Sequence, residues 1–300
     1  KWIIDNSDLF QGQLLICTHN SNFLSGVLSS DKKVDIFRLN RHDNITEYNL
    51  LPPNATDNLS KSPILSSQRV IEGIFHKGVV VCEADADRAV YQSVASVEYM
   101  SNQEILFIHS HNKQTHKDVA RLLVEAKIPV ALIVDIDIFN GDADLKNILE
   151  ILGDNLENVD LLEKRKVIAE SVNKVSENEI LEYVKNEIKL FLEQLEKGEH
   201  TLNGAKSAYK RIEKEFTSWK DVKDKGIIGF SSDIQPTVIA LINALKAKGI
   251  FVVPVGELEG WMDLGTKKKN KWIILALNKI HSRGCSPELK DFIKEVLAFF

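Results

Sequence analysis

The chain has 300 residues, which suits one large domain or two of ordinary size. Hydrophobic residues make up 44% and charged residues 27%, a composition typical of a globular protein with a sizeable core. The net charge of −5 argues against a protein that coats nucleic acid, although a local basic groove is compatible with it.

The cysteines and the apolar runs indicate a cytoplasmic location. The three cysteines form no CxxC pair and no disulfide framework, which favours a reducing compartment. No apolar run reaches the roughly 18 residues needed to cross a bilayer, so we expect no membrane contact. The chain has no recognisable signal peptide, and Lys1 lies in a helix-like segment. We therefore expect a fragment of a longer protein or a processed chain.

The first fifty residues combine strand-like runs with one helical turn. Residues 14–20 form an apolar run with a polar end, which predicts a buried strand, and the helical turn follows at 22–27. Residues 34–39 and 45–50 alternate polar and apolar side chains around the turn-like residues 41–44, which predicts a β-hairpin.

Residues 51–69 are rich in Pro, Ser and Asn, which predicts a linker. From residue 74 onward, strand and helix patterns alternate. Strands are expected at 79–82, 105–108 and 130–134, separated by one helix that turns Val90, Tyr91, Val94 and Val97 to one face and another at 117–127. Two such βαβ units predict a parallel sheet, because their crossovers are right-handed.

Residues 141–225 are charged, helical in pattern and nearly free of strand signal. Residues 176–179 fit a capping box in front of a helix, and residues 201–220 predict a second helix. Their apolar faces do not sustain several heptads, so we expect a packed helical insertion rather than a coiled coil. The α/β pattern resumes with a helix at 236–248 and a strand at 250–255. The predicted fold class is α/β, a parallel sheet flanked by helices with an inserted helical subdomain.

Acidic residues follow the predicted strands at informative spacings. Glu83 and Asp87 are four residues apart across a strand-to-helix junction, and Asp135 and Asp137 are two apart, the spacing at which side chains of an extended segment share a face. Ligands collect at the carboxyl ends of strands in open α/β sheets. Four converging carboxylates would repel each other without a cation, and carboxylate sites suit Mg²⁺ or Mn²⁺ better than zinc.

These motifs resemble the Toprim domain of the OLD (overcoming lysogenization defect) family of ATP-dependent nucleases. The resemblance covers a strand ending in Glu83, an acid four residues later, and the Asp-x-Asp of 135–137. Residues 75–78 and the Gly-Glu-Leu-Glu run at 256–259 are similar to the OLD version in particular. Residues 15–24 resemble the switch-histidine region that ends an ABC-type ATPase head, with His19 in the place of the phosphate-sensing histidine.

The resemblance implies a domain division and a chemistry. Residues 1–50 would end an ATPase domain, 51–69 would be a linker and 70–300 would be the Toprim nuclease domain. The expected activity is metal-dependent cleavage of DNA in bacterial defence against phage. The expected mechanism uses two metal ions, Mg²⁺ or Mn²⁺. No Walker A motif is present, so ATP would act only through the head, which in related proteins makes a homo-oligomer.

The resemblance also assigns roles to individual residues. Glu83, Asp135 and Asp137 would hold one metal ion, and Asp87 with Glu257 or Glu259 would support the second. A lysine would neutralise charge at the phosphate, and the sequence does not choose among four in one short run: Lys267, Lys268, Lys269 and Lys271.

Plainer interpretations stand beside these roles. Asp87 can be a first-turn helix acid, Glu257 and Glu259 can be surface residues, and Asp85 is expected to be a solvated turn residue. His109 and His111 lack the further ligands of a zinc site. Two alternatives remain open for the whole domain. One is an RNA-cleaving Toprim nuclease, and the other is a non-catalytic scaffold that binds nucleic acid or a partner. The scaffold is prompted by Ala84, which stands where Toprim domains usually have glycine, and by the unusual turn at 109–113.

Overall fold

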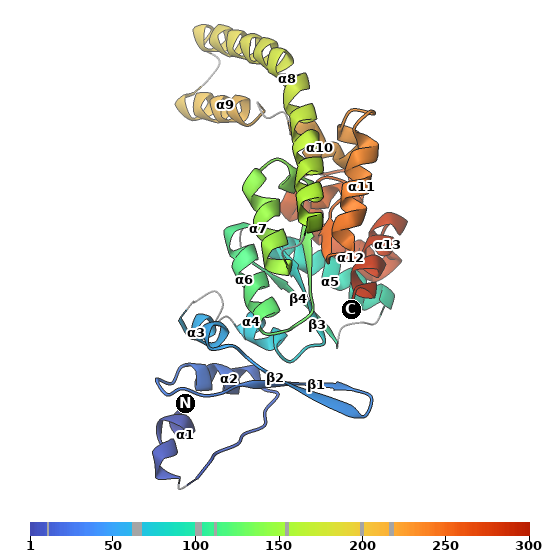
Figure 1. Ribbon diagram of the computed structural model, residues 1–300. Coiled ribbons are helices and arrows are strands. Elements are labelled where there is room, and N and C mark those ends of the chain that lie inside the picture. Colours follow the sequence, from blue (N-terminus) through green and yellow to red (C-terminus); the bar gives the residue numbers. More distant parts are fainter. Residues whose placement is uncertain are drawn as a thin grey trace.

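The computed structural model of the protein describes residues 1–10, 12–61, 68–99, 104–110, 113–153, 156–198, 201–215 and 219–300. At its centre is a four-stranded parallel sheet in the order β4-β3-β5-β6 (Figure 1). The strands are β3 (Gly78–Cys82), β4 (Ile105–His109), β5 (Val130–Val134) and β6 (Ile250–Val252). A separate antiparallel hairpin consists of β1 (Phe37–His42) and β2 (Ile45–Leu50).

Helices make up most of the remaining described chain. In chain order they are α1 (Trp2–Asp5), η1 (Ser7–Leu9), α2 (Ser21–Leu28), α3 (Pro53–Lys61), α4 (Gln68–Gly73), α5 (Asp85–Tyr99), α6 (Lys113–Glu125), η2 (Ile136–Phe139), α7 (Asp142–Leu152), α8 (Leu156–Glu196), α9 (Leu202–Glu215), α10 (Lys220–Lys225), η3 (Gly226–Gly229), α11 (Gln235–Lys246), η4 (Leu258–Trp261), α12 (Lys269–Arg283) and α13 (Pro287–Ala298). None of the described helices is long and apolar enough to cross a membrane.

The sheet is buried on both faces, which makes the protein a three-layer α/β structure. Val79 and Val81 pack into a core with α6, α7, α8 and α11, whereas Val80 and Cys82 pack into a second core with α5, α12 and α13. All five residues of β3 and of β5 are buried. The apolar runs at 79–82 and 130–134 therefore lack polar alternation because neither side of the sheet meets water.

The predicted α/β class, the parallel sheet and the strands at 79–82, 105–108 and 130–134 are confirmed. The hairpin is also confirmed, with a tighter turn than expected. Arg41 and His42 belong to β1, and Asp43 at φ 52° makes the turn with Asn44. A positive φ at a hairpin turn suits Asp and Asn, which tolerate the left-handed region.

The prediction of a buried strand at 14–20 is wrong. These residues form no strand, and Leu15 is 82% exposed. A strand needs a partner to receive its backbone hydrogen bonds, and no strand of the described chain pairs with this run. Apolar composition alone could not supply that partner.

The region expected to be a linker contains helices. Residues 53–61 form α3, and Leu51, Ala55 and Leu59 are buried in the core that covers one face of the sheet. Pro53 is the first residue of α3, a position at which proline is well tolerated because the first helical N–H needs no partner within the helix. The domain boundaries drawn from the sequence remain predictions.

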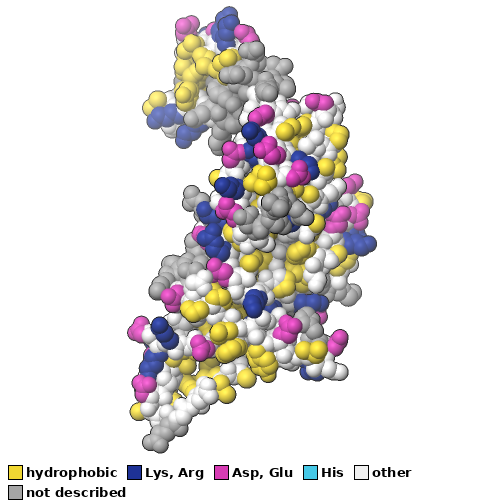
Figure 2. All heavy atoms as spheres, in the orientation of Figure 1, with side chains coloured by type: hydrophobic (Ala, Val, Ile, Leu, Met, Phe, Trp, Pro, Cys, Tyr) yellow, Lys and Arg dark blue, Asp and Glu magenta, His cyan; other side chains and the backbone are white. Residues whose placement is uncertain are grey.

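The helical segment between β5 and β6 differs from expectation in two ways. No helix begins at the capping box of 176–179, because α8 runs through it from Leu156 to Glu196. The far end of α8 and α9 form an arm that extends from the body, and hydrophobic side chains gather on it (Figures 1 and 2). Exposed apolar residues of this arm include Leu181, Leu190, Leu192, Leu202 and Tyr209. The near part of α8 contributes Leu161 and Ile168 to the core that covers one face of the sheet, as expected of an insertion, whereas the described side chains of the arm do not join this core.

Candidate functional site

Glu83 and Asp135 meet at the carboxyl edge of the sheet. Glu83 directly follows β3 and Asp135 directly follows β5, and these two strands are paired in parallel. The backbone N–H of Asp135 donates a hydrogen bond to Oε1 of Glu83 over 3.2 Å. The structure thus brings together two acids that lie far apart in the sequence, at the edge where α/β sheets bind ligands.

Asp137 is not on an extended segment with Asp135, which corrects the expectation drawn from their spacing. Asp135 is extended (φ −68°, ψ 154°), but Asp137 lies in the 3-10 helix η2. The N–H of Ile138 donates to the Asp135 carbonyl, which turns the chain immediately after β5. The two carboxylates therefore leave the backbone from different local conformations.

Lys223 pairs with Asp137, a contact that no sequence motif predicts. Lys223 Nζ lies 2.8 Å from Asp137 Oδ2. Lys223 belongs to α10, the short helix that follows α7, α8 and α9 along the chain. Its position depends on tertiary packing, so no local motif could have found it.

Asp87 combines a capping role with burial. Its Oδ2 accepts a hydrogen bond from the N–H of Ala84 over 3.0 Å, which fixes the first turn of α5. The side chain is only 7% exposed, and burial raises the pKa of its carboxyl group, an effect that the positive charge of Lys269 opposes. Lys269 Nζ lies 3.8 Å from Asp87 Oδ1. Asp87 is thus both the capping acid of the plainer interpretation and part of a charged cluster.

Glu257 and Glu259 lie at the start of η4, close to the same cluster. Burial and then the charge of Glu259 raise the pKa of Glu257, and Glu259 also raises the pKa of Asp87. Trp261 in η4 donates from its indole Nε1 to the hydroxyl of Tyr91 in α5 over 3.2 Å. This buried bond ties η4 to the helix that carries Asp87.

The lysine run of 267–271 reaches the acids through Lys269. Lys267, Lys268 and Lys271 are exposed on either side of it, at the start of α12. Of the four lysines that the sequence left open, Lys269 is the one that the structure pairs with Asp87.

The remaining predicted residues lie beside or away from the acids. Asp85 is exposed at the start of α5, where it pairs with Arg88 (2.7 Å) and with His109 Nε2 (3.5 Å). His111 lies outside the described residues. His19 is exposed just before α2. Its proposed origin in an ATPase head stays a prediction.

The donor set fits a hard divalent cation in its chemistry, because the acids at this edge offer carboxylate oxygens without a cysteine. Among the described residues, no three His, Cys, Asp or Glu side chains are grouped closely enough to hold a metal ion. Glu83 contacts the Asp135 backbone, Asp137 pairs with Lys223, and Asp87 lies near Lys269. Side-chain rotations at these strand ends would be needed to gather the carboxylates.

Residues 74–137 match the family model described as "Overcoming lysogenization defect protein-like, TOPRIM domain". This segment runs from the residues before β3 through Asp137 and contains Glu83, Asp87 and Asp135. It is an OLD-like Toprim domain, a type that typically binds Mg²⁺, generally carries metal-dependent nuclease activity and acts on nucleic acids. Searches of curated proteins and of solved structures found no match to the chain.

Proposed function

We propose that this OLD-like Toprim domain is a metal-dependent endonuclease that hydrolyses phosphodiester bonds of DNA. The contact between Glu83 and Asp135 carries the proposal, because it places two acids of the Toprim motifs side by side at the carboxyl edge of the parallel sheet. The match of residues 74–137 to the OLD-like Toprim model supports the same chemistry.

Each acid has a role in this proposal. Glu83, Asp135 and Asp137 would hold one divalent ion, and Asp87 with Glu257 or Glu259 would support a second. Bound ions of this kind activate a water molecule and stabilise the leaving oxygen. Lys269, with Lys267 and Lys271 beside it, offers positive charge for the phosphate.

The similarity of residues 15–24 to the end of an ABC-type ATPase supports a position of this domain after such a head, through which ATP would control cleavage. The intact protein would then be a homo-oligomer, and phage DNA would be its substrate in bacterial defence.

Nicking of a supercoiled plasmid with Mn²⁺ tests the proposal. Glu83→Gln and Asp135→Asn should each abolish nicking while circular dichroism shows an unchanged fold. Asp85→Asn is a matched control, because Asp85 lies two residues from Glu83 but is exposed and paired with Arg88. Undiminished nicking by either site variant would rule out the assignment.

Two further measurements separate the rival functions. Parallel assays with DNA and structured RNA should show faster cleavage of DNA, and a preference for RNA would overturn the choice of substrate. Mn²⁺ should raise the melting temperature of the wild type, because a ligand that binds the folded state stabilises it. No stabilisation and no cleavage would favour the non-catalytic scaffold.

A further inference from the structure

The arm at the far end of α8 consists of two helices that lie away from the body of the protein (Figure 1). Its first helix is the part of α8 from residue 181 to residue 196, and its second is α9, which begins at Leu202. Helices joined by so short a connection run antiparallel as neighbours, and Figure 1 shows α9 returning along the end of α8. Each helix of such a pair covers only one side of the other.

The half-buried positions of the arm mark the sides on which its two helices meet. On α8 these positions are Val184, Glu187 and Phe191, and on α9 they are Gly204, Ala205 and Ala208. The helix α9 therefore places its smallest residues next to α8. Its larger apolar side chains, Leu202 and Tyr209, are 72% and 60% exposed. A helix that packed only against α8 would be expected to do the reverse, because large apolar side chains gain most from burial.

The exposed apolar residues of α8 form a stripe beside its contact with α9. They recur at intervals of seven, four and three residues: Leu181, Ile188, Leu192 and Leu195. At about 100° per residue, this spacing keeps the four side chains within an arc of roughly 60°. Such a stripe is typical of a helix that packs against other helices. Because the two helices are antiparallel, the same angles put Leu202 and Tyr209 on the same side of the arm as this stripe. These six residues form one apolar surface, which we call the arm face.

The charges on the arm make the arm face complementary to a second copy of itself. Residues 181–196 of α8 contain four acids and two lysines, whereas residues 202–210 of α9 contain two lysines and no acid. In a dimer with two-fold symmetry the same surface of both copies meets. The acidic helix of each copy can then lie against the basic helix of the other. The pairing of opposite charges favours this arrangement over one in which α8 meets α8.

The size of the arm face suits a weak but specific dimer. The 14 residues of α9 make the face about 20 Å long, and two adjacent helices make it roughly 20 Å wide. Each copy would thus cover about 400 Å² in flat projection, and interdigitating side chains would raise the total for both copies to roughly 1,000 Å². This total is near the lower limit for a biological interface, so we expect a dissociation constant of roughly 1–100 µM.

We propose that two copies of this chain associate through their arm faces, with α9 of each copy packed against α8 of the other. The contact would place the six apolar residues of the arm face between four helices, as in the core of a helical bundle. Lys185 interrupts the stripe of α8 and pairs with Glu182 over 3.4 Å. A polar residue at such a position lowers stability but fixes the register of packed helices. The proposal is independent of the nuclease function.

Sedimentation velocity of the whole chain tests the proposal. Between about 1 and 300 µM, the mass should rise from 33.8 kDa toward twice that value. Leu192→Glu should weaken association by more than about tenfold, because it places a charge in the arm face. Leu190→Glu is a matched control and should dimerise like the wild type. Leu190 is 51% exposed and Leu192 is 53% exposed, but two positions along a helix separate them by about 200°.

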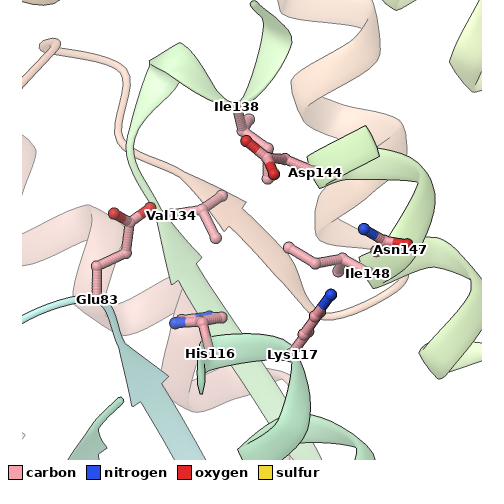
Figure 3. Close-up of a pocket in the computed structure, with 8 residues that line it drawn as sticks. All are labelled: Glu83, His116, Lys117, Val134, Ile138, Asp144, Asn147 and Ile148. Carbon is pink, nitrogen blue, oxygen red and sulfur yellow. The ribbon is translucent and has the colours of Figure 1, made fainter. Parts of the chain in front are cut away.

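The charge pairing has its own test. Lys206→Glu combined with Lys210→Glu should weaken the dimer several-fold, because both changes place acids of α9 against the acidic helix of the other copy. Circular dichroism should show all these variants folded, since the changed side chains are exposed. The changes also lie outside the body, where Glu83 lines a cavity of about 80 Å³ (Figure 3).

Three results would overturn the proposal. One is a wild-type chain that stays monomeric at the highest concentration. Another is a Leu192→Glu variant that dimerises as tightly as the Leu190→Glu control, which would place the contact on a different surface. The third is an unchanged dissociation constant after both lysines are replaced, which would exclude the packing of α9 against α8 of the other copy.

Discussion

Gly256 lies in the loop before Glu257, where the backbone closely approaches the backbone of α10. Replacing Gly256 should lower the stability of the fold and the activity of the site. Gly256 has φ +95°, and a Cβ at this position would lie 2.0 Å from the carbonyl oxygen of Lys223. That oxygen belongs to the backbone and cannot rotate away. The segments would have to separate by about 1 Å to reach the 3.0 Å below which real contacts are essentially never found.

The expected cost of Gly256→Ala has two parts. The left-handed backbone costs a residue with a Cβ roughly 1–2 kcal/mol, and overpacking adds roughly 1–3 kcal/mol. The free energy of unfolding should therefore fall by about 2–5 kcal/mol. Gly265→Ala separates the two parts, because Gly265 also has a positive φ (+69°) but a Cβ there meets nothing within 4 Å. It should lose only about 1–2 kcal/mol.

Equilibrium unfolding in urea measures the difference between the two variants. With a slope of about 3 kcal/mol/M, the midpoint of Gly256→Ala should lie roughly 0.3–1 M below that of Gly265→Ala. Nicking should also fall, because Lys223 pairs with Asp137 and Gly256 directly precedes Glu257. Equal midpoints for the two variants would show that the loop and α10 do not make this close backbone contact.

Three further predictions concern other contacts. Burial lowers the pKa of the His116 ring from 6.5 to about 4 in the folded protein. The unfolded chain therefore binds more protons between these two pH values. The free energy of unfolding should fall by roughly 3 kcal/mol as the pH drops from 6.5 to 4. Urea midpoints measured across this range should change less in His116→Gln, whereas the exposed His281→Gln should follow the wild type. Lys223→Met should raise the Mn²⁺ affinity several-fold in calorimetry, because the ammonium group 2.8 Å from Asp137 competes with the metal for that carboxylate. Lys225→Met is the control and should leave the affinity unchanged, because it loses only its pair with Asp221. Arg38→Met should cost roughly 2–5 kcal/mol in urea unfolding, because the buried guanidinium donates to the carbonyls of Ile74, His76 and Lys127, whereas the exposed Arg41→Met should change stability by less than about 1 kcal/mol.

The parallel sheet was predictable because short stretches of sequence show both the apolar strands and the helices that cover them. β3 and β5 are short runs of buried apolar residues, and β3 is followed by α5, a helix with a buried apolar face. The same logic failed for residues 14–20, where an apolar run is exposed and unpaired within the described chain. Burial of a strand depends on a neighbouring strand, and no local pattern records whether that neighbour is present.

Some residues of the candidate site could be placed from the sequence, and others depend on tertiary packing. Glu83 and Asp135 could be placed together from sequence, because strand ends of a parallel sheet share one edge. The positions of Asp137, Lys223 and Lys269 could not, because η2 turns the chain after one residue and the lysines arrive on later helices. The acids offer one shared edge for metal and phosphate, whereas the ion pairs with Lys223 and Lys269 come from two different segments. A change in the packing of either α10 or α12 would therefore alter the charge around the acids without altering any Toprim residue, which gives distant parts of the chain a direct physical means to control the site.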